Sequence, residues 1–385
     1  MKYLLHITTL LFLITLGYTQ NSTQKVLWDK KANQPIAYAT ITTDNENVIS
    51  NNEGVFSLNS IPKTLAIQSI TYYDTLITPT QFHANDTLFM RSKNFVLNEI
   101  VIENENSYKK MVGTIKSHFA LQPHDESFFL RAIIKKNDSL YKIADFAGNL
   151  RKETLFGTKS LPVPKKNYTV HLKHMRKVGL DGRHINFIML DFNRLLTLFA
   201  SVNFTPDIYN YTYENTDDHF LKITALPKDP SKVRSTGYYI VNDTDYILNE
   251  AYLSTNQIGE FVEIGGIKNR NNSLTKKTTF KQNPTTHKYQ LNFAFIQDET
   301  EVVYNGNTDI YSSTYIFYST PKSPDVNLKN NINLNKDIFE LKVKYDATYW
   351  DNQTVLPLTA EMQEFINKVN LNTKNKEFKS VTNIK

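Results

Sequence analysis

The chain has 385 residues, which is enough for two or three domains with sizeable hydrophobic cores. It contains no cysteine, which excludes disulfide bonds and a lipidated N-terminal cysteine. Its formal charge of +6 is mild for this length, so it suits contact with an anionic surface but gives no reason to expect a nucleic-acid partner.

The N-terminus has the order of an export signal. Lys2 precedes an apolar run from Tyr3 through Leu16, and the small residues Gly17 and Thr19 follow that run. This order predicts a signal peptide over residues 1–19. An uncleaved membrane anchor is the alternative, but the run is shorter than the roughly 20 apolar residues of a spanning helix. No later segment is long and apolar enough for such a helix, so we expect a mature chain that is soluble or peripheral to a membrane.

The next part of the chain alternates between short apolar stretches and polar turns. Abundant aromatic and β-branched residues favour strands there, and regularly spaced turns are typical of a small β-sandwich. We expect that sandwich over residues 20–103, with these strand candidates: KVLW, IAYATITT, VIS, GVFSL, TLAIQSITYY and LNEIVI.

Gly54 stands directly after the polar run at 51–53 and before alternating apolar residues. We expect it to take a positive φ in a hairpin turn, which glycine adopts without steric strain. Phe56 and Leu58 then point into the sandwich, while Val55 and Ser57 face the other way. In the IAYATITT stretch the same alternation predicts that three side chains share one face of the strand: Ala37, Ala39 and Ile41.

Three segments in order resemble the carboxypeptidase regulatory-like domain, a transthyretin-like, peptidase-associated β-sandwich. They are DKKANQPIAYATI at 29–41, SNNEGVFSL at 50–58 and LNEIVI at 97–102, and their motif residues are Pro35, Ala39, Gly54, Phe56 and Leu58. Two positions depart from the family pattern. Gln24 stands where the family often has glycine before the first strand, and Thr71 replaces the glycine of an Ile-Gly-Tyr motif.

The resemblance implies a module of the Gram-negative bacterial cell envelope, and not a peptidase. A zinc carboxypeptidase needs a His-x-x-Glu pair and a distant histidine, but none of the nine histidines is followed three residues later by glutamate. We therefore expect no catalytic residue, no metal and no cofactor. In this family such modules usually serve in folding or interaction, which implies a location in the periplasm or at the outer-membrane-associated cell surface.

A change of period marks a helical linker over residues 104–125. Its apolar residues recur at helical spacing, and we expect this stripe to pack in a core, although a partner-binding groove is the alternative. The stripe consists of Tyr108, Met111, Val112, Ile115 and Phe119.

Residues 126–370 are expected to form a β-rich α+β domain with a curved antiparallel sheet and a few helices. The sequence places a hairpin turn at Asn137-Asp138 and an internal helix at 191–202. The segment PKDPSKVRSTGYYIVNDTDYILNEAYL, with its turn at 242–245, looks like the half-barrel of periplasmic lipoprotein carriers. The whole chain is therefore expected to be mostly β.

A helix is expected near the C-terminus, with Thr359 as N-cap and Glu361 in the first turn. We expect the helix to pack on the sheet through an apolar stripe of four residues: Met362, Phe365, Ile366 and Val369. Residues 371–385 are polar, and we expect them to fray.

Two groups of cationic or imidazole side chains are candidate sites. His171 and His174 are three residues apart, which on a helix could serve one metal ion. The surrounding sequence alternates like a strand, which sends residues three apart to opposite faces. A basic run is a possible contact for an anionic lipid or an acidic partner, or else a solvated strand edge. Its residues are Lys165, Lys166, Lys173, Arg176 and Lys177.

The sequence therefore favours a non-catalytic exported envelope protein with a binding or scaffolding role. Its expected partner is an envelope protein, a lipid or a glycan, with peripheral membrane association, and an apolar face of the second sheet is the expected binding surface. One alternative is a hydrolase with an unrecognised site within 126–320. Another is an outer-membrane transport or assembly component.

Overall fold

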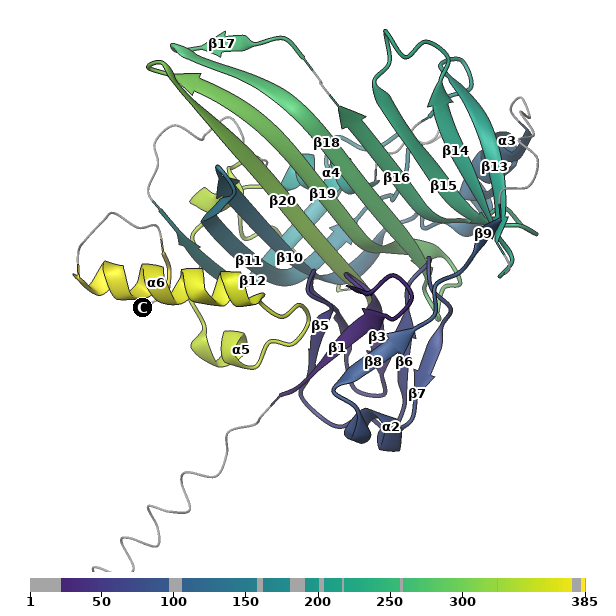
Figure 1. The fold of residues 1–385 in the computed structure, drawn as a ribbon, viewed down its shortest axis with the longest axis horizontal. Coiled ribbons are helices and arrows are strands. Elements are labelled where there is room, and N and C mark those ends of the chain that lie inside the picture. Colours follow the sequence, from purple (N-terminus) through teal and green to yellow (C-terminus); the bar gives the residue numbers. More distant parts are fainter. Residues whose placement is uncertain are drawn as a thin grey trace, which may run out of the picture. The chain divides into compact units, whose positions relative to one another are not determined.

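The structure is a computed structural model that describes residues 22–96, 106–157, 162–180, 191–200, 204–216, 218–256, 259–323, 325–375 and 382–384. The expected signal peptide and the LNEIVI segment lie outside the described residues. The chain divides into two compact units, both rich in strands (Figure 1). The first contains the residues up to Ser92 together with Ala347–Thr359, and the second contains Lys93–Asp346 and Ala360–Lys385. The chain is mostly β, as the sequence predicts.

The first unit consists of two four-stranded sheets around one apolar core. In the first sheet β1 pairs with β2, β5 and β8, which are Thr23–Asp29, Gln34–Pro35, Val55–Leu58 and Thr87–Met90. The second sheet has the order β4-β3-β6-β7, with strands Asn47–Ile49, Thr40–Thr43, Leu65–Gln68 and Thr75–Ile77. The short helix α2 (Pro79–Ala84) places Phe82 in the core.

Gly54 has a φ of +75°, as the sequence predicts, but its turn is not a hairpin. Strand β4 before the turn and strand β5 after it belong to different sheets, so the turn carries the chain across the core. A Cβ on Gly54 would lie 2.5 Å from the carbonyl oxygen of Leu27, which excludes a side chain. Phe56 and Leu58 are fully buried in the core.

The IAYATITT stretch differs from its predicted alternation. The backbone at Tyr38 has a φ of +57°, and β3 begins only at Thr40. Ile36 is therefore buried in place of Ala37, which is exposed. Ala39 is fully buried as expected, and its amide donates to the Ser50 hydroxyl at 3.0 Å.

Residues 347–359 are part of the first unit, although the sequence analysis places them in the second domain. They begin with the short helix α5 (Ala347–Asp351). The amide of Ile49 donates to the carbonyl of Val355 at 2.8 Å. The Thr354 hydroxyl donates to the Glu46 carboxylate at 2.9 Å. The first unit is thus built from two segments that are far apart in the sequence.

The second unit is organised around one twelve-stranded sheet, in which every pairing is antiparallel (Figure 1). The strand order is β12-β11-β10-β20-β19-β18-β16-β15-β14-β13-β9, and β17 pairs with β18. From β9 to β20 the strands are Phe95–Val96, His124–Lys136, Ser139–Lys152, Tyr168–Gly179, Tyr209–Thr216, Phe220–Pro227, Ser235–Asn242, Leu248–Asn256, Val262–Ile264, Ile267–Gln282, Tyr289–Tyr304 and Asn307–Lys322. The predicted turn at Asn137-Asp138 joins β10 to β11 with positive φ at both residues.

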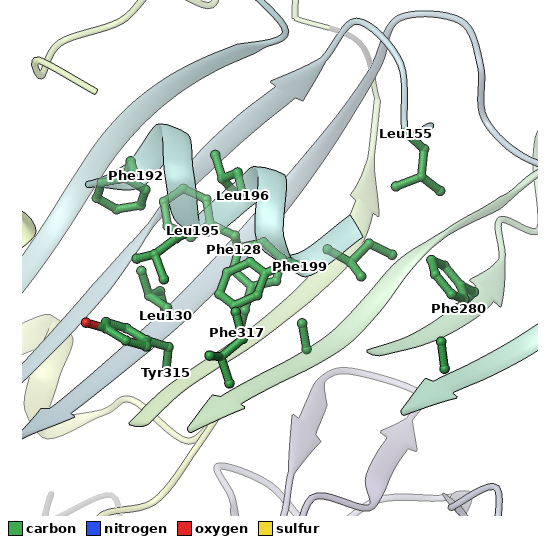
Figure 2. Close-up of a cluster of buried hydrophobic side chains, with 14 of the residues drawn as sticks. Phe128, Leu130, Leu155, Phe192, Leu195, Leu196, Phe199, Phe280, Tyr315 and Phe317 are labelled. Atoms are coloured by element: carbon green, nitrogen blue, oxygen red, sulfur yellow. The ribbon is translucent and has the colours of Figure 1, made fainter. Parts of the chain in front are cut away.

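The helix α4 (Phe192–Ala200) packs on one face of this sheet, here called the inner face. It confirms the predicted internal helix. Its apolar side chains point into a core that is shared with the sheet strands (Figure 2). Helix α3 (Asn106–His118) contributes to the same core, where Met111 is buried and Tyr108 stacks on Tyr211. Val112 of the predicted stripe is instead exposed.

Helix α6 (Ala360–Asn375) packs on β11 and β12, and begins directly after Thr359 as predicted. Beside it, on the face opposite α4, Arg131 donates two hydrogen bonds to the Asp145 carboxylate, and Arg176 donates to the same group. Burial raises the pKa of Asp145, but the two guanidinium groups outweigh it and hold the pKa below its usual range.

A short 3-10 helix (Ile338–Glu340) adds Ile338 and Phe339 to the inner core.

Asparagine side chains close the free edge of β12. The Asn331 side chain accepts from the amide of Leu172 and donates to its carbonyl, and Asn330 accepts from the amide of Val170. Asn383 accepts from the Lys177 amide at 2.7 Å. Residue 383 lies in the tail that was expected to fray, so part of that tail is ordered along the strand. Filled backbone groups leave no template for another strand at this edge.

We expect Gly54→Ala to lower the free energy of unfolding by about 1–3 kcal/mol, because it combines a positive φ with a clash against backbone. Gly265→Ala is the matched control, since Gly265 also has a positive φ but nothing within 4 Å of an added Cβ. Thermal unfolding of both variants tests this expectation. Equal melting temperatures for Gly54→Ala and the native chain would contradict it.

We expect Asn331→Ala to lower the free energy of unfolding by about 1–2 kcal/mol, because it leaves the amide and carbonyl of Leu172 without their partners. The opened edge should also promote self-association at high concentration. Urea denaturation and light scattering measure the two effects. Asn327→Ala, an exposed change in the same segment, is the control, and identical behaviour of the two variants would refute the role of Asn331.

Candidate functional site

The inner face of the second unit is the candidate site, because it combines a large apolar surface with buried polar groups. Figure 2 shows Phe192, Leu195 and Phe199 of α4 facing side chains of the strands. The rings of Phe199 and Phe317 lie 5.0 Å apart, and Phe128 stacks on Phe317 at 6.0 Å. Strand residues that pair across neighbouring strands share a face, so this surface continues along β10, β20, β19 and β18.

Side chains from outside the helix tie down both ends of α4. At its N-terminus the Asp191 carboxylate accepts from the Arg194 amide at 2.7 Å. At its C-terminus Lys276 donates to the carbonyl of Leu198 at 2.7 Å, and Thr278 donates to that of Phe199 at 2.8 Å. Helix ends leave carbonyl groups unpaired, and a cation there is favourable. Two neighbouring positions of β18 thus fix the helix on the sheet.

Burial lowers the pKa of Lys276 to about 8. The charged ammonium form therefore predominates over the neutral amine only below about pH 8, so the hydrogen bond to the Leu198 carbonyl loses its charge in alkaline solution.

Asp298 and Ser313 form a second polar spot on the inner face. They are direct partners across β19 and β20, and Ile296 and Tyr315 are the next inner-face pair on the same strands. Ser313 is fully buried, and its hydroxyl has no hydrogen-bond partner among the described residues. Burial raises the pKa of Asp298 to about 7. A half-buried carboxyl and a buried hydroxyl side by side can bind a polar group of a ligand.

A third polar cluster lies on the same face at the other end of β10. The Lys152 ammonium donates to the Glu126 carboxylate at 2.8 Å, and His124 lies 3.5 Å from the other carboxylate oxygen. Burial raises the pKa of Glu126, but Lys152 and His124 outweigh it and hold the pKa below its ordinary value. Burial lowers the pKa of Lys152 against the opposing effect of Glu126. The Lys152–Glu126 ion pair stabilises the fold, while Glu126 Oε1 and His124 Nε2 are buried without a hydrogen-bond partner among the described residues, as is the Ser313 hydroxyl.

The basic run predicted as an anionic contact does not form one surface. Lys165, Lys166 and Lys173 are exposed, and for them the contact stays a prediction. Arg176 is bound to Asp145. Lys177 is buried and donates to the carbonyls of Phe339 and Leu341, so it is unable to meet an external anion in this conformation.

The two histidines of this strand lie on one face, and not on opposite faces as the sequence predicts. Lys173 is an extra residue of β12 with no register partner in β11, and this β-bulge shifts the register so that His171 pairs with Asn149 and His174 pairs with Ala147. His174 lies 3.3 Å from the Asp346 carboxylate. In the described part of the chain no group of three or more histidine, aspartate or glutamate side chains is placed to hold a metal ion.

Sequence reasoning missed Lys276, Asp298 and Ser313. The signal for Asp298 lies in the alternation of β19, where Ala294, Ile296 and the aspartate occupy every second position. An acidic residue in an apolar register is therefore visible, but its neighbour Ser313 is fifteen residues away and is recognised only once the strands are paired.

None of the helices among the described residues has the length and apolar character to span a membrane.

Comparison with known proteins leaves the family open. No family profile matches the chain, and no curated protein sequence does. A solved LolA superfamily protein from Nitrosomonas europaea is 11% identical, and the match covers 58% of this chain and 98% of that one with a TM-score of 0.22. MucB in complex with MucA(peri) is 8% identical over 58% and 100% of the two chains, with a TM-score of 0.17. A Pseudomonas aeruginosa MucA/MucB complex gives 7% identity, 57% and 98% coverage, and a TM-score of 0.16. These values are too low to support a statement about this chain.

We expect Asp298→Asn to stabilise the protein at neutral pH but not in acid. The folded-state pKa is about 7, well above the usual 3.8, so the folded state keeps a proton that the unfolded state releases. Native stability therefore falls as pH rises from about 4 to 7, whereas asparagine does not titrate. The advantage of the variant should grow by on the order of 2–4 kcal/mol between pH 4 and pH 8. Urea unfolding at both pH values measures it, and a pH-independent difference would contradict the assignment.

Proposed function

We propose that this chain is a non-catalytic, exported envelope protein that binds a lipid-class ligand on the inner face of its second unit. The observation that carries the proposal is the combination, on one face, of a continuous apolar surface and the Asp298–Ser313 pair. An apolar surface with few polar groups is the usual composition of a small-molecule site. The export signal predicted from Lys2 and the apolar run supports the envelope location.

The binding step is a replacement of contacts. In the structure α4 fills the apolar surface with its own side chains, and the core holds together through those contacts. An acyl chain would occupy part of the same surface, since it is as apolar as the leucine and phenylalanine side chains that it replaces. Its polar end would reach Asp298 and Ser313, where a neutral carboxyl below pH 7 donates as well as accepts a hydrogen bond.

The first unit is proposed to be a carboxypeptidase regulatory-like module with a scaffolding role. Its two sheets around one core support this assignment, as do the positive φ of Gly54 and the burial of Ala39, Phe56 and Leu58. Segment 347–359 completes the unit, so the module is not separable from the rest of this chain by a single cut.

Native mass spectrometry of residues 20–385 from the native envelope fraction tests the ligand. We expect a reproducible added mass that is lost on extraction with organic solvent. Ser313→Ala should weaken retention about two- to tenfold, the effect of one hydrogen bond.

Ser312→Ala is the matched control, because Ser312 neighbours Ser313 and faces the opposite side of β20. A bare mass for the native protein, or equal loss from both variants, would refute binding at this face.

A further inference from the structure

Strand β17 and the ends of β18, β19 and β20 extend beyond the neighbouring strands at one end of the sheet (Figure 1). The pairing of β10 with β20 ends at Tyr311, and the pairing of β16 with β18 ends at Ser273. Beyond these points, in the part of the chain that the structure describes, only β17 and the ends of β18, β19 and β20 remain paired to one another. We call this part the strand-end tip. It comprises residues 261–270, 301–304 and 307–310.

Two tight turns hold the tip in shape. Gly265 and Gly266 join β17 to β18 with φ of +61° and +80°, and Asn305 and Gly306 join β19 to β20 with φ of +49° and +77°. Two-residue turns with positive φ match the twist of the strands that they connect. The tip is therefore a paired, regular end of the sheet, and the side chains on it have fixed faces.

The tip carries exposed apolar side chains on both faces: Val262 and Ile264 lie on the side of the inner face, and Phe261 lies beside Arg270 on the opposite side. Phe261, Val262 and Ile264 are 40%, 55% and 64% exposed. Val262 pairs across the strands with Asn269 and then Val302, and Ile264 pairs with Ile267. Val302 belongs to the inner core and Ile267 packs against it, so one apolar row runs from the buried inner face to the exposed tip.

Charged side chains of the tip neutralise one another. Lys268 lies 3.9 Å from Glu263, and Arg270 pairs with Glu301 at 2.8 Å. The Arg270 guanidinium also lies over the ring of Phe261, 4.6 Å from its centre. A surface of this kind has no excess positive charge for anionic partners, and its attraction is mainly hydrophobic.

The small size of this apolar surface indicates what covers it. Val262 and Ile264, with these exposures, present on the order of 200 Å² on one face, well below the roughly 800 Å² per partner of a stable protein interface. A bilayer interface needs no matching surface, because each apolar side chain partitions into it independently. We propose that the strand-end tip inserts into the interfacial region of a phospholipid bilayer. This deepens the proposed function, since the inserted row leads directly to the lipid-binding inner face.

The absence of cysteine from the chain makes a labelling test clean. Ile264→Cys, carrying an environment-sensitive fluorophore, is mixed with vesicles of zwitterionic phosphatidylcholine. We expect a blue shift and an intensity gain of at least twofold, and little change when the salt concentration is raised. The labelled control is Val326→Cys, an 87% exposed position of the same unit away from the tip. Equal responses at both positions, or none at Ile264→Cys, would overturn the proposal.

Flotation of the unlabelled full chain with the same vesicles provides the second measurement. We expect Ile264→Asp to reduce vesicle binding about tenfold or more, because it puts a charge where an exposed aliphatic side chain would enter the membrane interface. Val326→Asp should bind like the native protein. Self-association that depends on Ile264 without any vesicle binding would show that a second copy covers the tip, and would overturn the proposal.

The two measurements separate this inference from the proposed function. Ile264→Asp lies outside the Asp298–Ser313 site, so it should keep the solvent-extractable mass while it loses flotation. A native chain that floats through the tip but carries no ligand would leave the membrane contact standing and refute the lipid-binding function. A chain that carries a ligand but never floats would do the reverse.

Discussion

The second unit depends on one constraint, which is that the apolar inner face of a very wide sheet must be covered. A helix of nine residues provides part of this cover, and its position is fixed by polar contacts at both ends. Lys276 and Thr278 hold the C-terminal carbonyls of α4, while Asp191 caps its first turn. The aromatic side chains between these anchors then pack on the strands. Polar groups of β18 are thus buried because the helix end requires them.

A second constraint is the path of the chain. It leaves the first unit after Ser92, builds most of the second, returns as Ala347–Thr359 and ends in the second unit with α6. The returning segment supplies backbone and side-chain partners for Ile49 and Glu46. The first unit therefore completes its hydrogen bonding only with a segment that comes late in the chain.

Local signals in the sequence predicted local structure well, whereas pairing between distant strands stayed hidden. The turn at Asn137-Asp138, helix α4 and the start of α6 follow from residues that are neighbours in the sequence. Strand β18 escaped notice because its composition is mostly Asn, Lys and Thr, and its 16 residues are held by pairing with β16, β17 and β19. The bulge at Lys173 interrupts the alternation of the histidine strand itself, and it is recognised only from the pairing of that strand with β11. The Asp298–Ser313 site likewise exists only through strand register.

The apolar row from the inner core to the tip connects these features. Side chains of one face continue from Val302, which is buried, through Ile267 to Ile264, which is mostly exposed. A sheet that served only as a structural support would end such a row with polar residues, because exposed aliphatic groups at a strand end favour aggregation. Instead, the β12 edge is closed by asparagines while the tip remains apolar. The same chain therefore blocks one route of association and keeps another open, and the open one leads to the face where a lipid would lie.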